Sequence, residues 1–133
     1  MSCKSLLYTA LTNATTVAAG GTIPPGNVIR KFGRAIQLNG SAILLNDPGY
    51  YKITAISTVQ PDAAAPITMT LKENGSPIPG ALATATPTAI DDDTLLVVDG
   101  VVRVYCTLAP KLITAELNVG ADVENMTITV EKV

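Results

Sequence analysis

The stretch that most constrains the fold of this chain covers residues 47–59 and reads DPGYYKITAISTV. It opens with Asp-Pro-Gly, in which the proline presets φ and the glycine accepts the positive φ of a tight bend. The residues that follow are aromatic or β-branched, as strands prefer. With a period of two, one face carries Tyr51, Ile53, Ala55, Ser57 and Val59, and its composition predicts that it points inward. We therefore predict a central strand of an all-β domain.

The composition limits how such a domain is built. Of the 133 residues, 47% are hydrophobic but only 4% are aromatic, and Trp and His are absent. Aliphatic residues and Thr must therefore form the core, which favours two sheets packed face to face. The length predicts one domain, residues 1–133, that needs no metal or disulfide. Charged residues make up only 15% of the chain, against roughly 25% in soluble domains. This low value indicates a surface partly covered by copies or partners.

Turn residues divide the rest of the chain into short β-prone segments. Asn39-Gly40 and Asn74-Gly75 are hairpin signals, and loops are predicted over residues 60–66 and 120–124. Clean alternation over residues 67–71, 113–119 and 126–130 is typical of strands with one solvated face. No helix, repeat or linker is predicted. About eight to ten strands at spacings of roughly 8–12 residues indicate an antiparallel β-sandwich of the jelly-roll type.

Residues 95–106 do not alternate. Almost every position is apolar, and only Asp99-Gly100 and Arg103 interrupt the run. A strand with one solvated face should alternate, so both faces of this one are expected to be covered, by a second layer or by a neighbouring subunit. The Asp99-Gly100 pair is either a hairpin turn or a bulge within one long strand.

The sequence offers little catalytic or metal-binding chemistry. Without His, a Ser-His or Cys-His nucleophile pair is absent, and we predict that the chain is not an enzyme. Asp91, Asp92 and Asp93 are most simply a solvated loop tip, because three consecutive acids cannot all point at one ion. A Ca²⁺ site shared between subunits is the alternative. No other cofactor is predicted.

Charge and hydropathy also limit the partners and the location. The net charge of −2 gives no basic footprint for nucleic acid. No apolar run approaches the roughly 20 residues of a membrane helix, and the first residues do not form a signal peptide, so cytoplasmic synthesis without Sec export is expected. Cys3 and Cys106 are predicted to be free thiols, with a disulfide as the alternative. The basic cluster of Arg30, Lys31 and Arg34 is predicted to protect an edge strand rather than to bind a ligand.

Several motifs resemble the trimeric jelly roll shared by the C1q globular head and tumour necrosis factor families, including bacterial and phage versions. Residues 49–53 (GYYKI) are similar to the G-x-Y-x-[FI] strand, residues 71–75 (LKENG) are similar to the L-x-x-N-G hairpin, and the terminal strand 126–130 also fits. Residues 20–24 (GGTIP) and 104–106 (VYC) resemble short phage and prophage proteins of Firmicutes. The chain lacks the aromatic-rich core and the collagen-like stalk of C1q, which argues against a complement-type function.

The resemblance implies a homotrimer in which one sheet faces the threefold axis. That sheet would hold residues 49–53, 95–106 and 126–130, whereas residues 67–71 and 113–119 would lie in the outer sheet. A threefold interface would cover the outer side of the doubly apolar strand. The residues expected at this interface are Tyr50, Leu95, Val97, Val102 and Val104.

The function implied is that of a structural or adhesion module in a phage virion, such as a head fibre, a decoration protein or a tail-tip knob. Loops near residues 60–66, 89–94 and 120–125 would lie at one end of the trimer and face a capsid or tail protein, or a host surface glycan. One alternative is the trimeric head of a bacterial spore-surface or cell-surface protein. Another is a small ligand-binding or carbohydrate-binding module, against which the scarcity of Trp, Tyr and His argues.

Overall fold

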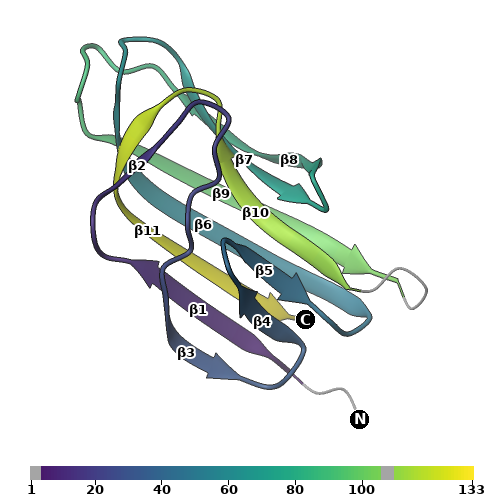
Figure 1. Cartoon of the computed structure of the whole chain (residues 1–133). Coiled ribbons are helices and arrows are strands. Elements are labelled where there is room, and N and C mark those ends of the chain that lie inside the picture. The colour runs from purple at the N-terminus through teal and green to yellow at the C-terminus, as the bar shows by residue number, and fades with distance from the viewer. Residues whose placement is uncertain (1–3, 106–109) are drawn as a thin grey trace.

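The computed structural model describes residues 4–105 and 110–133, so Cys3 and Cys106, and the prediction of free thiols, lie outside the described residues. The described chain forms two antiparallel sheets packed face to face, which confirms the predicted jelly-roll sandwich (Figure 1). Eleven strands occur in these residues, one more than the upper end of the predicted range. No helix that could cross a membrane is found among them.

Sheet A has six strands in the order β3-β1-β11-β6-β9, and the short β2 pairs with β11 outside this order. Its members are β1 (Leu6–Leu11), β2 (Thr15–Val17), β3 (Asn27–Phe32), β6 (Gly49–Pro61), β9 (Thr94–Val104) and β11 (Ala121–Lys132). Sheet B has five strands in the order β4-β5-β10-β7-β8. Its members are β4 (Ile36–Asn39), β5 (Ala42–Leu45), β7 (Ile67–Glu73), β8 (Ser76–Ala85) and β10 (Lys111–Leu117). The division of the predicted strands between two sheets is therefore confirmed.

Strand β6 is the central strand that the sequence predicts. It pairs along nearly its whole length with β11 on one side and with β9 on the other. The turn before it is held by Tyr51, whose hydroxyl donates a hydrogen bond of 2.6 Å to the backbone oxygen of Asp47. All five predicted inward residues, from Tyr51 to Val59, are buried. The strand continues to Pro61, two residues into the predicted loop.

Both predicted hairpins are present. Asn39-Gly40 links β4 to β5, and Asn74-Gly75 links β7 to β8. In the second hairpin Asn74 has φ of 49° and Gly75 has φ of 85°. Two consecutive positive φ values are what the favoured two-residue hairpin turn requires, and Asn and Gly adopt them at the lowest steric cost.

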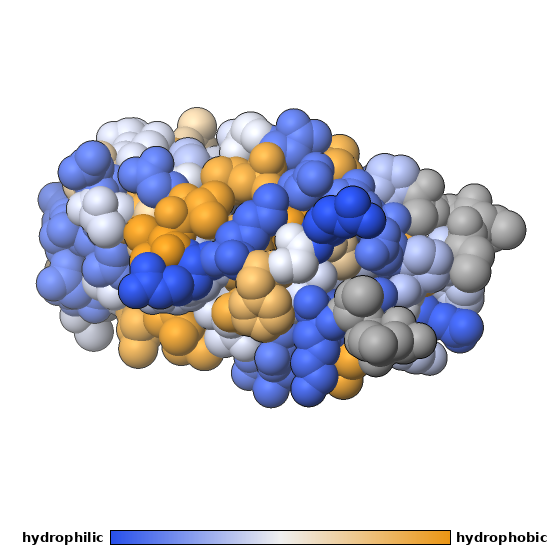
Figure 2. Space-filling view, turned by 90° about the horizontal axis from the view of Figure 1, so that it is seen from below, coloured by the Kyte–Doolittle hydropathy of each residue, from blue (hydrophilic) through white to orange (hydrophobic). Residues whose placement is uncertain are grey.

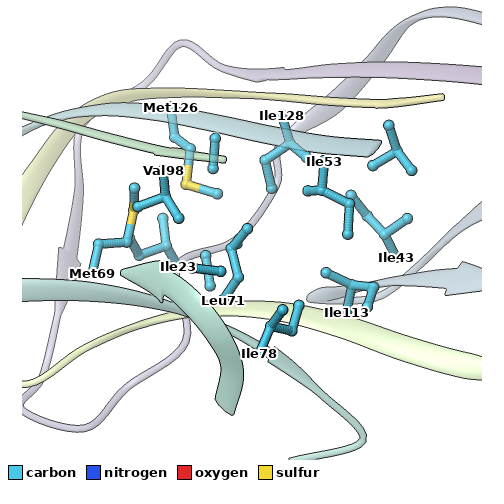
Figure 3. Close-up of a cluster of buried hydrophobic side chains, with 14 of the residues drawn as sticks. Ile23, Ile43, Ile53, Met69, Leu71, Ile78, Val98, Ile113, Met126 and Ile128 are labelled. Carbon is cyan, nitrogen blue, oxygen red and sulfur yellow. The ribbon is translucent and has the colours of Figure 1, made fainter. Parts of the chain in front are cut away.

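The core fills the space between the two sheets and is almost entirely aliphatic (Figure 3). Side chains from both sheets meet there, including Ile53, Val98, Met126 and Ile128 of sheet A and Leu71 of sheet B. Tyr51 is the largest fully buried side chain. The prediction of an aliphatic core between two packed sheets is confirmed.

Strand β9 corrects one prediction. It pairs with β6 without a register shift, from Val104 opposite Gly49 to Thr94 opposite Val59, so Asp99-Gly100 is neither a hairpin nor a bulge. Gly100 instead permits close packing between the sheets, since a Cβ atom at this position would lie 3.0 Å from the Cβ of Ala81 in β8. The inward and outward positions of β9 therefore alternate without a change of phase.

The loops at one end of the sandwich meet as predicted, although one boundary was wrong. The backbone nitrogen of Asp62 donates to the oxygen of Gly120 at 3.1 Å, and that of Asp91 donates to the oxygen of Pro61 at 2.9 Å. Strand β11 begins at Ala121, so only Gly120 of the turn predicted over residues 120–125 lies outside the strand. The pairing of this strand with β6 shifts register between Val123 and Asn125, which marks a bulge where a turn was expected.

Candidate functional site

The outward face of sheet A is the candidate site, because it carries apolar side chains where solvated residues are expected. The register between β6 and β9 arranges this face in rows. From the loop end downward the rows are Thr58 with Leu95, Ile56 with Val97, Thr54 with Asp99, Lys52 with Val101, and Tyr50 with Arg103.

Five large apolar or aromatic side chains of this face are exposed on two neighbouring strands. Their exposed fractions are 62% for Leu95, 47% for Val97, 62% for Val101, 38% for Ile56 and 51% for Tyr50. Single exposed apolar residues are normal, but several on one face of two neighbouring strands are a mark of an interaction surface. We call these five residues the β9/β6 face.

The structure separates the five residues predicted for an interface into two groups. Tyr50, Leu95 and Val97 lie on the β9/β6 face, and their place in an interface between copies stays a prediction. Val102 and Val104 are only 2% and 1% exposed and belong to the core between the sheets. Because inward and outward positions alternate along the whole of β9, Val102 and Val104 point the opposite way from Leu95. Their assignment to an interface does not fit the structure.

Two members of the β9/β6 face, Val101 and Ile56, were missed by the sequence reasoning. Strict counting from Leu95 in steps of two reaches Val101, and that signal was available in the sequence. It was lost because Gly100 was interpreted as a turn or a bulge. Ile56 lies among polar residues in the sequence, and only the pairing of β6 with β9 places it beside Val97.

The lower end of the face is aromatic and basic. The guanidinium carbon of Arg103 lies 5.4 Å from the ring centroid of Tyr50 and 4.4 Å from that of Tyr105. The ammonium nitrogen of Lys111 lies 6.0 Å from the Tyr105 ring. Stacking on aromatic rings partly replaces water around a cation, so Arg103 is a charge that a contacting partner can cover at low cost.

A polar row divides the face between the Ile56–Val97 row and the Lys52–Val101 row. Thr54 Oγ1 donates a hydrogen bond of 2.6 Å to Asp99 Oδ1. Lys52 stands opposite Glu131 in the β6–β11 register, which places opposite charges side by side on neighbouring strands. The apolar side chains of the face therefore form two groups, Leu95, Val97 and Ile56 towards the loop end and Val101 with Tyr50 at the other end.

The three consecutive acids do not converge on a common point. Asp92 Oδ2 accepts a hydrogen bond of 2.6 Å from Thr88 Oγ1, and Asp93 Oδ1 accepts one of 3.0 Å from Gln60 Nε2. Asp91 has φ of 61°, and its backbone nitrogen bonds to the β6 strand end as described above. Within residues 4–105 and 110–133, no group of three or more His, Cys, Asp or Glu side chains is placed to hold a metal ion. The geometry therefore favours the solvated loop tip.

Comparison with known proteins places the fold. No family profile matches the chain, and no curated protein matches it. Murine APRIL at pH 5.0 is similar in structure, with a TM-score of 0.75 and 14% identity over 98% of this chain and 100% of that one. The PRD1 vertex protein P5 gives a TM-score of 0.65 and 15% identity over 97% of this chain and 96% of that one.

The globular domain of the zebrafish complement 1qA protein is also similar, with a TM-score of 0.67 and 7% identity over 95% of this chain and 94% of that one. At such identities the likeness shows the fold alone. The chain therefore has a jelly-roll fold of the kind found in the tumour necrosis factor and C1q families.

Proposed function

We propose that this chain is a non-enzymatic structural or adhesion module that assembles as a homotrimer through the outward side of sheet A. The observation that carries the proposal is the β9/β6 face. Complete burial of one Leu, Val or Ile side chain stabilises a protein by about 1.5–3 kcal/mol. Covering the β9/β6 face in each of three copies would therefore supply a substantial driving force for assembly, even after the entropic cost of association.

The number of copies is supported by the resemblance to trimeric jelly rolls, whose threefold axis lies against the sheet that corresponds to sheet A. The polar residues of this sheet are compatible with such an interface, because Thr54 and Asp99 hydrogen-bond to each other within the chain and Lys52 stands opposite Glu131, a residue of opposite charge. The aromatic stacking of Arg103 also lowers the cost of removing its charge from water.

Cross-linking between amines and carboxylates tests the trimer. If the proposal is right, the products on a denaturing gel form a ladder that stops at three chains, also when the protein is dilute. A ladder that stops at two chains, or that continues to high multiples, would contradict a closed trimer. The same reaction after denaturation in urea is the control, and it should yield single chains.

The particular setting that we propose is a phage particle, in which the trimer is a head fibre, a decoration protein or a tail-tip knob. Support comes from the structural likeness to the PRD1 vertex protein P5 and from the GGTIP and VYC segments that resemble phage and prophage proteins. In this setting the loop end, where residues 62, 91 and 120 meet, would be available to a capsid protein, a tail protein or a host surface glycan.

Immunogold labelling tests the setting. Particles induced from the source organism are purified, incubated with an antibody raised against the chain, and examined by electron microscopy. Label at a constant position on virions is expected. Label on the cell envelope or on spores, with virions bare, would refute the phage assignment and support the surface-head alternative. A strain that lacks the gene is the control for antibody specificity.

A further inference from the structure

Strand β3 forms the edge of sheet A that lies opposite to β9. All six of its residues are exposed. Among them are three hydrophobic residues, with exposed fractions of 43% for Val28, 43% for Ile29 and 55% for Phe32. Among residues 4–105 and 110–133 the strand pairs only with β1. Its outer side therefore presents backbone donors and acceptors together with apolar side chains.

The same edge is basic. Arg30 and Lys31 lie within β3, and Arg34 follows it. None of the three forms a salt bridge within the described part of the chain, where the ion pairs are Lys72 with Glu116 and Lys111 with Glu73. Figure 2 looks at the side on which β3 lies in Figure 1, and it shows hydrophobic and strongly hydrophilic side chains interleaved there. The prediction that this basic cluster lies at a sheet edge is confirmed.

A bulge shapes this edge. Tyr8 of β1 pairs with Arg30, and the next residue, Thr9, pairs with Val28, so Ile29 is the extra residue of β3. The carbonyl oxygen of Ile29 accepts a hydrogen bond of 2.9 Å from Nη1 of Arg30. The bulge thus places the guanidinium of Arg30 against the backbone of its own strand.

Acidic side chains gather at the loop end of the sandwich. Backbone hydrogen bonds bring the segments of Asp62 and Asp91 to the end of β6, where Gln60 contacts Asp93 and pairs with Asp122. Such a distribution would repel a negatively charged partner from the loop end and guide it to the basic edge, in spite of the overall charge of −2.

We propose that the β3 edge binds an extended acidic segment of a partner protein, in which apolar and acidic side chains alternate. Arg30, Lys31 and Arg34 would attract its carboxylates. Phe32 and Ile29 would contact its apolar side chains, and the open strand would offer hydrogen bonds to its backbone. The site is separate from the β9/β6 face, since β3 and β9 are the two opposite edges of sheet A.

A polypeptide fits this edge better than an anionic polymer. A sulfated or phosphorylated chain would use the three cations but would leave the exposed Val28, Ile29 and Phe32 without apolar partners. It would also leave the backbone hydrogen-bond donors and acceptors of the open strand without partners. Lys31 and Phe32 are consecutive and therefore lie on opposite faces of the strand. A paired peptide that alternates acidic and β-branched residues can place its acids on the Lys31 face and its apolar side chains on the Phe32 face.

Fluorescence anisotropy with a short labelled peptide of alternating valine and glutamate tests the proposal. We expect binding at low ionic strength that weakens as NaCl is added, because the contacts involve exposed charges. K31E and F32S should each weaken binding by about tenfold, which corresponds to the loss of roughly 1.4 kcal/mol. The matched controls, Q37E in edge strand β4 and L82S in edge strand β8, should bind as the wild type does. Leu82 is 54% exposed, close to the 55% of Phe32.

Three results would overturn the proposal. The first is absence of binding to the valine–glutamate peptide at low salt while circular dichroism shows a folded chain. The second is equal binding by polyglutamate or by heparin, which would show that the site recognises only the charge of its ligand. The third is unchanged binding by both K31E and F32S. If K31E instead self-associates and the wild type binds no peptide, the cluster only protects the edge. The peptide measurement is independent of the mass of the assembly, so its failure would not affect the trimer.

Discussion

The two outward faces of the sandwich differ although both belong to antiparallel sheets of similar size. On sheet B, outward side chains satisfy one another. Lys72 forms a 3.0 Å salt bridge with Glu116, and the hydroxyls of Thr68 and Thr84 lie 2.7 Å apart. On sheet A, the five residues of the β9/β6 face leave apolar surface exposed beside a stacked arginine.

The difference shows that folding of one chain and assembly of several chains make separate demands on the sequence. The inward sides of both sheets are aliphatic, because the core requires it. The outward side of sheet B is mostly polar, as expected for a face in water, and its exposed leucines, Leu82 and Leu112, lie on strands that β7 separates. Only the outward side of sheet A has a composition that the fold of the isolated chain does not explain, and a contacting copy would explain it.

The largest effect is expected from a charge placed on the inward side of β9. V102D should unfold the chain, because Val102 is 2% exposed and an unpaired buried charge costs several kcal/mol. That cost is comparable to the roughly 5–15 kcal/mol by which a domain is stable. Circular dichroism during heating measures the effect. A cooperative transition at the wild-type temperature would show that Val102 is not in the core.

The second largest effect is expected on the outward side of the same strand. V97D should leave the chain folded, since Val97 is already 47% exposed, but it should dissociate the trimer by leaving a charge without a partner at each interface. Sedimentation velocity measures the loss of the larger species. Q37D, on an exposed position of sheet B, is the control and should sediment as the wild type does. A V97D protein that remains trimeric would exclude Val97 from the interface.

A smaller effect is expected where the two sheets approach most closely. G100V should destabilise the chain by about 1–3 kcal/mol, because added atoms would overlap the Ala81 side chain, whose Cβ would lie 3.0 Å from the new Cβ. Urea unfolding measures the loss. The second change A81G should recover part of it, and a double-mutant cycle would show coupling between the two positions. Independent, additive effects would contradict close packing as the reason for this glycine.

Sequence reasoning succeeded where the cause of a structure lies in neighbouring residues. The alternation from Tyr51 to Val59 predicted the inward face of β6, and the Asn-Gly pairs predicted two hairpins. It failed at Gly100, because a glycine inside a strand indicates a bulge when only the strand is considered. The actual reason is Ala81, which belongs to the other sheet and is brought near only by the fold.

The candidate site could be predicted only in part for the same reason. Two apolar faces in residues 95–106 indicated that β9 is covered on both sides, but the phase across Gly100 decided which residues point outward. The bulge at Ile29 had no sequence signal, since it depends on the pairing of β3 with β1. The meeting of the acidic loops likewise depends on the topology and not on any local motif.

The smallest effect is expected on the outward face of sheet B, where polar side chains bond to one another. K72A removes the salt bridge to Glu116, whose two side chains are 28% and 22% exposed. Partly exposed ion pairs contribute about 0–1 kcal/mol, so thermal unfolding should shift only slightly and the mass of the assembly should not change. Dissociation caused by K72A would show that sheet B also takes part in assembly, and the contrast between the two faces would be lost.

The most direct test of the central claim is the mass of the wild-type protein in solution. Light scattering coupled to size exclusion, run over a dilution series in the micromolar range and with a reductant present, gives this mass without any substitution. The reductant ensures that a bridge through Cys3 or Cys106 cannot produce the result. The predicted value is three times the 13.7 kDa of one chain. A single species of 13.7 kDa throughout the series would contradict assembly through the β9/β6 face.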